Sequence, residues 1–268
     1  MNPVEPHVAV QDLTVAYGDT VILRDLTFTI NRGDIFIIMG ASGGGKSTLL
    51  RSMVGLLPPA AGHVLYDGHS LWSMDTEEQS RILRRFGVLY QGGALWSSLT
   101  LAENVALPLQ QYTTLGPRQI KDIVSLKLSL VGLSGFEDHS PSEISGGMKK
   151  RAALARAMAL DPDVLFFDEP SAGLDPISAH LLDELILELR DSLRATVVVV
   201  THELASIFAI GNNSVFIDAD TRTITATGDP RTLLTDSRDP KVISFLTRGA
   251  GIVDKAQKRT SLDRGARP

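Results

Sequence analysis

The segment with the most distinctive chemistry runs from Gly40 to Ser47 and reads Gly-Ala-Ser-Gly-Gly-Gly-Lys-Ser. It follows the apolar run Ile35–Met39 and precedes a helical pattern over Thr48–Gly55. Glycines let the backbone turn so that successive N–H groups point into one hollow, and the start of the following helix also favours an anion. The spacing G-x-x-x-x-G-K-[ST] therefore predicts a phosphate-binding loop, in which Lys46 neutralises phosphate oxygens and the Ser47 hydroxyl binds Mg²⁺. The expected phosphate contacts are Gly40, Ala41, Ser42, Gly43, Gly44, Gly45, Lys46, Ser47 and Thr48.

A second group of candidate residues follows the apolar run Val164–Phe167, which ends in the acids Asp168 and Glu169. In a parallel α/β sheet, ligands bind at the carboxyl ends of the strands, so both acids are placed for a site. We expect Asp168 to face Mg²⁺ and Ser47. We expect Glu169 to lie nearer bulk water and to polarise an attacking water molecule. Without the glycine-rich loop, the same pair is equally compatible with a solvated strand end.

Strand and helix patterns alternate along the chain and predict the framework that positions these residues. The runs Val8–Tyr17 and Val21–Ile30 flank Gly18-Asp19 and predict an antiparallel hairpin. The other expected strands are Ile35–Met39, Val64–Tyr66, Phe86–Tyr90, Val164–Phe167, Thr196–Val200 and Ser214–Asp218. The other expected helices are Thr76–Arg84, Pro117–Val131, Ser145–Leu160, Ser178–Leu193 and Glu203–Ile210. This alternation predicts an α/β fold with a parallel sheet, in which residues 92–155 form an inserted helical subdomain. Residues 249–268 are expected to be a disordered tail or a docking arm.

Composition limits the class of protein. The 268 residues carry 26 Lys+Arg against 31 Asp+Glu, a net charge of -5, which disfavours a nucleic-acid partner because phosphate backbones attract basic surfaces. The sequence contains no cysteine, which excludes disulfides, thiolate zinc sites and cysteine nucleophiles. No apolar run approaches the roughly 20 residues of a spanning helix, and the first residues lack the pattern of a signal peptide. We therefore expect a soluble protein that is made in the cytoplasm and reaches a membrane only through a partner.

The segment Ile144–Met148, Ile-Ser-Gly-Gly-Met, precedes a strongly helical run and adds a third candidate site. A serine at a helix start followed by two glycines presents free N–H groups and a hydroxyl to an anion, although the pattern alone fits a helix cap equally well. Ser145 lies 99 residues after Lys46 (145 − 46) and 23 residues before Asp168 (168 − 145). With this spacing the segment resembles the signature motif of ABC-type ATPases, and the resemblance extends over residues 6–248, the expected ABC ATPase domain.

The resemblance implies roles for further residues. Tyr17 resembles the aromatic residue that stacks on adenine, and Gln91 resembles the glutamine that reaches Mg²⁺ and senses the γ-phosphate. Asp175 belongs to a segment similar to the D-loop, and His202 resembles the histidine that contacts the γ-phosphate. The expected catalytic residues are Glu169, His202, Gln91 and Lys46, and the expected metal ligands are Ser47, Gln91 and Asp168.

The same resemblance implies an architecture and a cycle. The fold would be a P-loop ATPase with a RecA-like core, an antiparallel β subdomain and an inserted helical subdomain. Two copies would pack head to tail as a homodimer, with each ATP between the glycine-rich loop of one copy and Ser145, Gly146 and Gly147 of the other. Closure on ATP, attack by water aided by Glu169 and reopening would follow. The family signature usually ends in Gln, where this sequence has Met148, whose side chain lacks the amide group of Gln.

Within this family, the segment Gly92–Val105, the stretch Gly173–Ser178, Met148 and the ending Ser244–Gly249 resemble the Mla/Mce-type lipid-transport ATPases of double-membrane bacteria. That resemblance implies a peripheral subunit at the cytoplasmic face of the inner membrane. It would power movement of lipid, of the phospholipid class, between the inner and outer membranes. The implied partners are an integral membrane permease, a periplasmic Mce-type lipid-binding protein and a small cytoplasmic regulatory subunit.

Leu95 and Trp96 lie in the region that contacts a short helix of the membrane subunit in such transporters. We expect them to form an apolar socket for that helix, or else to belong to the core. Three other functions remain open at this point: the ATPase of another ABC system for amino acids or lipoprotein release, a soluble ABC ATPase that acts on nucleic acid, and a catalytically dead regulatory module. The intact lysine, acidic pair and histidine disfavour the last of these.

Overall fold

The computed structural model describes residues 6–249, which contain a six-stranded sheet in the order β10-β9-β3-β8-β7-β6. Neighbouring strands from β9 to β6 pair in parallel, and β10 pairs antiparallel with β9. The strands are β3 (Ile35–Gly40), β6 (Phe86–Leu89), β7 (Val164–Asp168), β8 (Thr196–Val200), β9 (Asn213–Asp218) and β10 (Thr223–Thr227). The expected tail, 249–268, lies outside the described residues except for Gly249.

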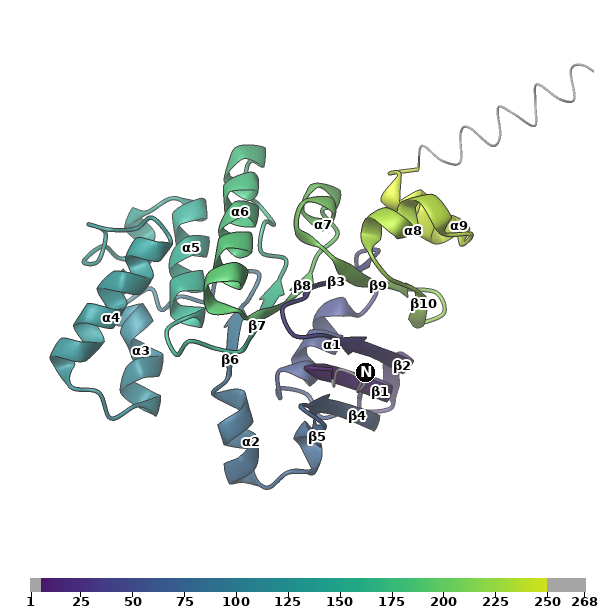
Figure 1. Cartoon of the computed structure of the whole chain (residues 1–268), viewed down its shortest axis with the longest axis horizontal. Helices are drawn as coiled ribbons and strands as arrows, with labels where there is room; N and C mark the ends of the chain where they lie inside the picture. Colours follow the sequence, from purple (N-terminus) through teal and green to yellow (C-terminus); the bar gives the residue numbers. More distant parts are fainter. Residues whose placement is uncertain (1–5, 250–268) are drawn as a thin grey trace, which may run out of the picture.

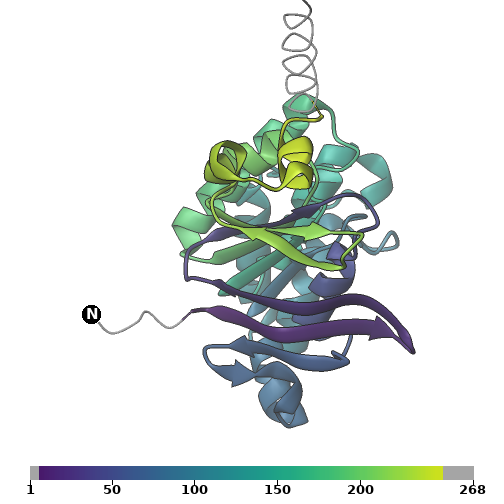
Figure 2. The ribbon, with the colours of Figure 1, turned by 90° about the vertical axis from the view of Figure 1, so that its right-hand side faces the viewer.

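A second sheet, antiparallel and in the order β2-β1-β4-β5, lies beside the first in the described part of the chain (Figure 2). Its strands are β1 (Val8–Tyr17), β2 (Thr20–Ile30), β4 (Ala61–Tyr66) and β5 (His69–Ser70). The helices are α1 (Lys46–Met53), α2 (Thr76–Leu83), α3 (Leu101–Tyr112), α4 (Pro117–Leu130), α5 (Gly146–Ala157), α6 (Pro176–Leu193), α7 (Leu204–Ile210), α8 (Pro230–Asp236) and α9 (Pro240–Leu246), with the single 3-10 turns η1 (Leu71–Ser73) and η2 (Pro141–Glu143). Among the described residues, no helix has the length and apolar content that crossing a membrane requires.

The parallel sheet separates two layers of buried side chains, because successive residues of a strand point to opposite faces. On β3, Ile35, Ile37 and Met39 belong to one cluster, whereas Phe36 and Ile38 belong to the other. The first cluster includes residues of α3 to α7, and the second includes residues of α1 and of the antiparallel sheet. Figure 1 shows α6 and α7 on one side of β3 and β8, with α1 and β1 on the other. Coverage of both faces explains why the central strands are apolar throughout.

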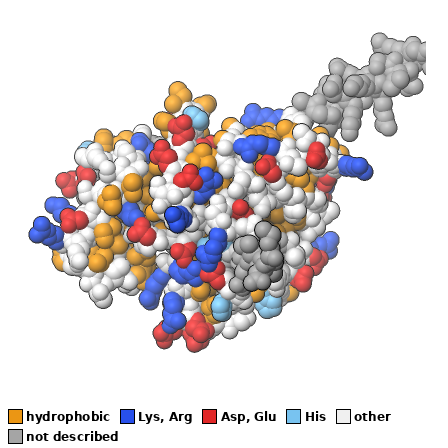
Figure 3. Space-filling view, viewed as in Figure 1, with side chains coloured by type: hydrophobic (Ala, Val, Ile, Leu, Met, Phe, Trp, Pro, Cys, Tyr) orange, Lys and Arg blue, Asp and Glu red, His pale blue; other side chains and the backbone are white. Residues whose placement is uncertain are grey.

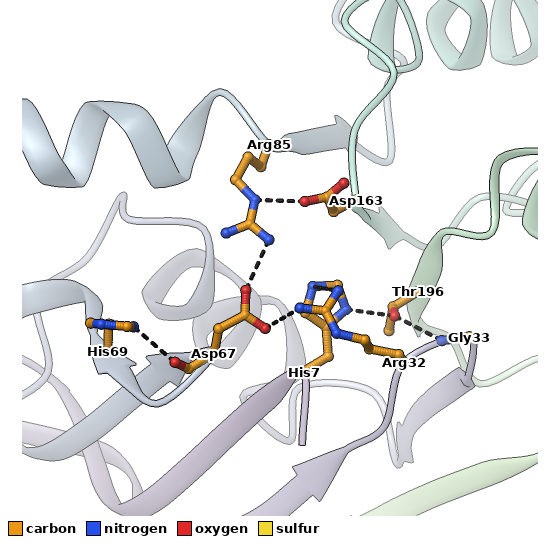
Figure 4. A network of polar contacts seen from close by, with 8 residues as sticks. All are labelled: His7, Arg32, Gly33, Asp67, His69, Arg85, Asp163 and Thr196. Atoms are coloured by element: carbon orange, nitrogen blue, oxygen red, sulfur yellow. Dashed lines mark hydrogen bonds and ion pairs between the residues drawn. The ribbon is translucent and has the colours of Figure 1, made fainter. Parts of the chain in front are cut away.

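A chain of polar contacts fixes the antiparallel sheet to the parallel one (Figure 4). His7, which precedes β1, is buried, and its Nδ1 lies 2.7 Å from the Thr196 hydroxyl at the start of β8. Arg32, which precedes β3, contacts both the His7 ring and Asp67, which follows β4. Asp67 also accepts from Arg85, with 2.9 Å between Oδ2 and Nη2. These contacts lie at the amino ends of β3 and β8, so they leave the opposite edge of the parallel sheet free.

The expected hairpin is confirmed, since β1 pairs antiparallel with β2 and the turn falls at Gly18-Asp19. Several elements of the described chain were not among the expected strands and helices: β5, α3, β10, α8, α9 and the 3-10 turns η1 and η2. Between β6 and β7 the described chain forms α3, α4, η2 and α5 and contains no strand.

Candidate functional site

The glycine-rich loop between β3 and α1 has backbone conformations that glycine adopts most easily. Gly40 has φ +147°, and Gly45, which precedes α1, has φ +84°. A Cβ atom on Gly40 would lie 2.3 Å from the carbonyl oxygen of Ile217 in β9, so a side chain has no room there. The loop leads directly from the carboxyl end of β3 into the N-terminus of α1, where unpaired N–H groups and the helix dipole favour an anion.

Lys46, the first residue of α1, is buried and turns back over the loop. Its Nζ donates to the carbonyl oxygens of Gly40 at 3.0 Å and of Ala41 at 2.9 Å. Burial lowers the pKa of Lys46, and the carboxylates of Glu169 and Asp168 act in the opposite direction. The ammonium group is therefore held inside the loop, with two acids close enough to stabilise its charge.

Ser47 and Asp168 place two oxygen atoms beside the same loop. Ser47 Oγ donates to Asp168 Oδ1 at 2.8 Å. Burial raises the pKa of Asp168, the hydrogen bond from Ser47 lowers it, and the neighbouring charge of Glu169 raises it further. Two oxygen ligands suit Mg²⁺, which binds few protein groups and keeps water or phosphate oxygens in its other positions. Within residues 6–249, no group of three or more His, Asp or Glu side chains could hold a metal ion on its own.

Glu169 is more enclosed than its place after the strand predicts. It is only 9% exposed and has φ +49°, a left-handed conformation that costs a non-glycine residue about 1 kcal/mol. Its Oε1 accepts from His202 Nδ1 at 2.8 Å, and its Oε2 is buried without a hydrogen-bond partner in the described part of the chain. The expectation that Glu169 lies nearer bulk water than Asp168 is therefore wrong, since Asp168 is only half-buried. The left-handed turn directs the Glu169 carboxylate toward His202 rather than toward solvent.

The order of the strands explains why these residues meet. Strands β3, β8, β7 and β6 are neighbours in the parallel sheet. The Lys46 loop follows β3, His202 follows β8, Glu169 follows β7 and Gln91 follows β6. Because parallel strands all end at one edge, segments far apart in the sequence share a single site there.

Two cations of α5 hold the loop after β6, and neither of them was expected from the sequence. The Lys150 ammonium is buried and donates to the carbonyl oxygens of Gln91 and, at 3.4 Å, of Glu169. Arg156 donates to the carbonyl oxygens at positions 93 and 94 at 3.0 and 2.6 Å. The run Lys-Lys-Arg at 149–151 was the available signal, but a charge run does not tell which side chain turns inward. The side chain of Gln91 itself is exposed, and its contact with a metal stays a prediction.

The comparison with known proteins decides the family. The family model described as "ABC transporter" matches residues 23–172, more than half of the chain. This chain belongs to the ABC transporter family. It is 42% identical over 239 residues to the "Intermembrane phospholipid transport system ATP-binding protein MlaF" of Haemophilus influenzae, with 89% of each chain covered. It is 40% identical over 244 residues to the "Probable ribonucleotide transport ATP-binding protein mkl" of Mycobacterium tuberculosis, with 91% of this chain and 67% of that one covered.

A solved ABC cassette shares the architecture. The structure described as "Dimeric structure of a post-hydrolysis state of the ATP-binding cassette MJ0796 bound to ADP and Pi" matches with a TM-score of 0.74 at 28% identity. The match covers 83% of this chain and 98% of that one. The expected fold class, an α/β P-loop ATPase of the ABC type, is confirmed, and the chain is an ATPase of that family.

The ABC signature segment lies apart from the Lys46 loop within this protomer. Ser145 is exposed and caps α5, since its Oγ accepts from the Met148 N–H at 3.3 Å. Across residues 6–249, no hydrogen bond or ion pair joins the segment Ser145–Gly147 to the Lys46 loop. The hydroxyl oxygen of Ser145 therefore acts as a helix cap in this chain, and the structure does not bring the segment to the other site residues.

Two other expected nucleotide contacts also stand apart. Asp175 caps α6, where hydrogen bonds from Ser178 hold the pKa of its carboxyl below the usual value. Ser178 Oγ lies 3.6 Å from the position that a Cβ atom on Gly147 would take, so the D-loop cap adjoins the signature. Tyr17 ends β1 with 45% of its surface exposed, and its hydroxyl accepts from Arg51 at 3.1 Å.

An open groove of about 640 Å³ lies between α2, β6, α3 and α5. Trp96, 63% exposed, lines it together with Pro108 and Tyr112 of α3. Leu95 instead packs against the core, so the structure divides the expected socket pair. The buried Asn104 holds the Trp96 backbone in place, because its side chain accepts from the Trp96 N–H at 2.8 Å and donates to its carbonyl oxygen at 3.1 Å.

Proposed function

We propose that this chain is the ATP-hydrolysing subunit of a membrane transporter whose cargo is lipid of the phospholipid class. The observation that carries the proposal is the meeting of Lys46, Ser47, Asp168, Glu169 and His202 at the carboxyl edge of one parallel sheet. A lysine in a glycine-rich loop, a pair of oxygen ligands and a carboxylate beside a histidine are the groups that transfer of a phosphoryl group to water requires.

Binding uses the loop and its flanking residues. The N–H groups of residues 40–48, including those at the N-terminus of α1, donate hydrogen bonds to the phosphates, and Lys46 exchanges its two carbonyl partners for phosphate oxygens. The exposed ring of Tyr17 stacks on adenine. Ser47 and Asp168 hold Mg²⁺, and Gln91 reaches it from the loop after β6. When bound, Mg²⁺ neutralises negative charge on the β- and γ-phosphates.

Hydrolysis uses the enclosed carboxylate. Because Oε1 of Glu169 is held by His202 Nδ1, Oε2 is the oxygen that accepts a proton from the attacking water. A carboxylate only accepts hydrogen bonds, so His202 donates to Glu169 from Nδ1. Phosphate oxygens are acceptors too, so Nε2, which lies 3.8 Å from Glu203 Oε1, donates to the γ-phosphate only when that nitrogen also carries a proton. His202 thus both orients the base and contacts the nucleotide.

The second half of each site comes from another copy of the chain. Ser145 and Gly146, which are exposed, and Gly147, which is half-buried, present N–H groups at the start of α5 to the γ-phosphate held by the partner's loop. The MJ0796 cassette, which is dimeric in its ADP- and Pi-bound structure, supports a homodimer of this kind. Binding of ATP between two such surfaces favours the closed dimer, and loss of the γ-phosphate favours opening.

The membrane partner docks in the groove beside Trp96, where an apolar helix of an integral permease would bury the indole. The chain therefore works at the cytoplasmic face of the inner membrane, with a periplasmic Mce-type lipid-binding protein and a small cytoplasmic regulatory subunit in the same assembly. Basic and acidic side chains are interspersed over the face seen in Figure 3, which supports a protein partner rather than nucleic acid.

The relatives' names give two cargoes, phospholipid for MlaF and ribonucleotide for mkl. Phospholipid is favoured because the MlaF match covers 89% of both chains, whereas the mkl match covers 67% of that protein. Ribonucleotide transport is the second candidate. In detergent micelles that contain the copurified complex, added phospholipid should stimulate ATP hydrolysis and added ribonucleotides other than ATP should not, and the reverse result would favour the second candidate.

The site itself is tested with Glu169→Gln and Lys46→Ala in the full chain. Glu169→Gln keeps a hydrogen-bond acceptor for His202 but removes the base, so ATP hydrolysis should fall by about 10²–10⁴-fold while an ATP-bound dimer accumulates on gel filtration. Lys46→Ala should abolish binding of a fluorescent ATP analogue or its turnover. Turnover at the wild-type rate in either variant would contradict the proposed roles.

The groove is tested with Trp96→Asp and the matched control Leu234→Asp. Leu234 is a 38% exposed leucine on α8, outside the groove. The Trp96→Asp variant should no longer copurify with the membrane protein that accompanies the tagged wild-type chain, although it should still bind ATP as the wild type does. The Leu234→Asp variant should copurify with that membrane protein as the wild type does. Equal recovery of the membrane protein with both variants would refute the docking site.

A further inference from the structure

Lys150 is a buried cation beside the site, and the mechanism above does not use it. It is 7% exposed, and its ammonium donates to the carbonyl oxygens of Gln91 and of Glu169. Lysine is rarely buried unless its charge is compensated. Burial lowers the pKa of Lys150, and the charges of Asp168 and Glu169 oppose this. The ammonium thus connects two segments that each carry an expected catalytic residue.

Helix α5 packs directly against the loop that this ammonium contacts. Lys150, Ala153 and Ala157 have the spacing that places side chains on one face of a helix. A Cβ atom on Gly87 of β6 would lie 2.3 Å from the Ala157 carbonyl oxygen, and one on Gly93 would lie 3.4 Å from Ala153 Cβ. The helix therefore rests directly against β6 and the loop after it, so the backbone that carries Lys150 lies close to the loop that its ammonium contacts.

Glu169 depends on its backbone contacts because its conformation is left-handed. Its N–H donates to the Val200 carbonyl oxygen at 2.8 Å, and its own carbonyl oxygen accepts from the Ala172 N–H at 3.2 Å and from Lys150 at 3.4 Å. Removal of the ammonium would take one of these contacts from Glu169 and would also release the Gln91 carbonyl.

We propose that Lys150 is a positioning residue that holds Gln91 and Glu169 in one geometry and ties both to α5, the helix that begins at the signature segment. The inference rests on the proposed hydrolysis of ATP at this site. Since Ser145 at the start of α5 would contact the ATP of the partner copy, a displacement of α5 reaches the base of its own copy through the Lys150 ammonium, and reaches the Gln91 loop through Lys150 together with Arg156.

The kinetic test compares Lys150→Met with Lys149→Met in the full chain with Mg²⁺ and ATP. Lys149 is the matched control, because it lies on the same helix turn and its side chain forms no hydrogen bond or ion pair within residues 6–249. Displacement of a catalytic group by about 1 Å costs roughly 100-fold in rate. The kcat of Lys150→Met should therefore fall by about 10- to 100-fold. The KM for ATP should stay within about twofold, because Lys150 does not contact the residue 40–48 loop.

The second readout does not depend on activity. In hydrogen–deuterium exchange, amides of residues 91–96 should exchange faster in Lys150→Met than in wild type or Lys149→Met, whereas those of β3 and β8 should not change. Unchanged exchange over 91–96, or a kcat equal to that of Lys149→Met, would overturn the inference. If thermal denaturation shows that Lys150→Met does not fold, Lys150→Gln, which is shorter and uncharged, carries the same two measurements.

The two proposals fail in different ways. A wild-type chain that does not hydrolyse ATP, alone or with its membrane partner, would remove the proposed function, and the exchange measurement would still decide whether Lys150 orders the loop. If ATP hydrolysis is lost in Glu169→Gln but not in Lys150→Met, the proposed function stands and only the positioning role of Lys150 is contradicted.

Discussion

A methyl group on Gly40 should be far more damaging than the same methyl group on Gly43, although both glycines lie in one loop. Gly40 has φ +147°, and a Cβ atom there would lie 2.3 Å from the Ile217 carbonyl oxygen of the neighbouring strand β9. Gly43 has φ +77°, and a Cβ atom there would have nothing within 4 Å. Gly40→Ala therefore combines backbone strain with a clash against main chain, whereas Gly43→Ala has backbone strain alone.

The structure gives the size of the difference. Backbone strain in a sparsely populated region costs about 1–3 kcal/mol, and forced overpacking costs about 1–3 kcal/mol more. Gly40→Ala should therefore lower the free energy of unfolding by about 4 kcal/mol, and Gly43→Ala by about 1 kcal/mol. In a domain of this size each kcal/mol lowers Tm by about 3 °C, so the expected losses are about 12 °C and about 3 °C.

The measurement is thermal denaturation followed by circular dichroism, together with binding of a fluorescent ATP analogue below Tm. Gly40→Ala should also bind the analogue less tightly than Gly43→Ala, because relief of the clash moves the end of β3 from which the loop starts. If the two variants melt within about 3 °C of each other, the reasoning from steric contact at Gly40 is refuted.

Two further predictions follow from the hydrogen bonds of the site and of the sheet contact. Asp168→Asn keeps a hydrogen-bond acceptor for Ser47 but removes the negative charge. The Mg²⁺ concentration for half-maximal ATP hydrolysis should therefore rise at least about 10-fold. An unchanged Mg²⁺ requirement would count against Asp168 as a metal ligand. Burial and the neighbouring Arg32 hold the pKa of His7 below its usual 6.5, so the stability that the neutral ring supplies is complete above about pH 6.5 and is lost as the pH falls through the lower folded value. His7→Asn should therefore flatten the fall in the free energy of unfolding between about pH 7.5 and about pH 5.5 in urea denaturation, and an equal slope in both proteins would contradict a lowered pKa of His7 in the folded chain.

The parts of the fold that the sequence predicted well are those with a local physical signal. Strand β8 coincides with the expected Thr196–Val200, because a short run of β-branched residues buried on both faces strongly favours a central strand. The helix expected over Thr48–Gly55 is present as α1, although it begins two residues earlier, at Lys46, directly after the positive φ of Gly45. The helix start at Ser145 follows from the capping preference of serine.

The elements that were missed lack such a signal. Helix α3 begins with the capping box Thr100 and Glu103, but Pro108 lies inside it, and proline removes a backbone hydrogen bond from a helix interior. Strand β10 and helices α8 and α9 have only five to seven residues each, so their formation depends on packing against β9 and the core rather than on periodicity. The inward direction of Lys150 likewise depends on how α5 lies against β6, which the local sequence does not specify.

The local sequence likewise did not predict how the adjacent acids Asp168 and Glu169 are oriented in the site. Alternation along a strand would send neighbouring side chains to opposite faces, so two adjacent acids should not serve one site. The strand alternation does not continue to Glu169, because β7 ends at Asp168 and Glu169 adopts a left-handed backbone conformation. The Asp168 carboxylate therefore contacts Ser47, and the Glu169 carboxylate contacts His202. Glutamate has no special preference for that conformation, in contrast to Asn, Asp or Gly, and the turn is held by contacts that come from other strands and from α5. The separate contacts of the two acids therefore follow from one backbone angle fixed by distant residues, and not from their distance to solvent.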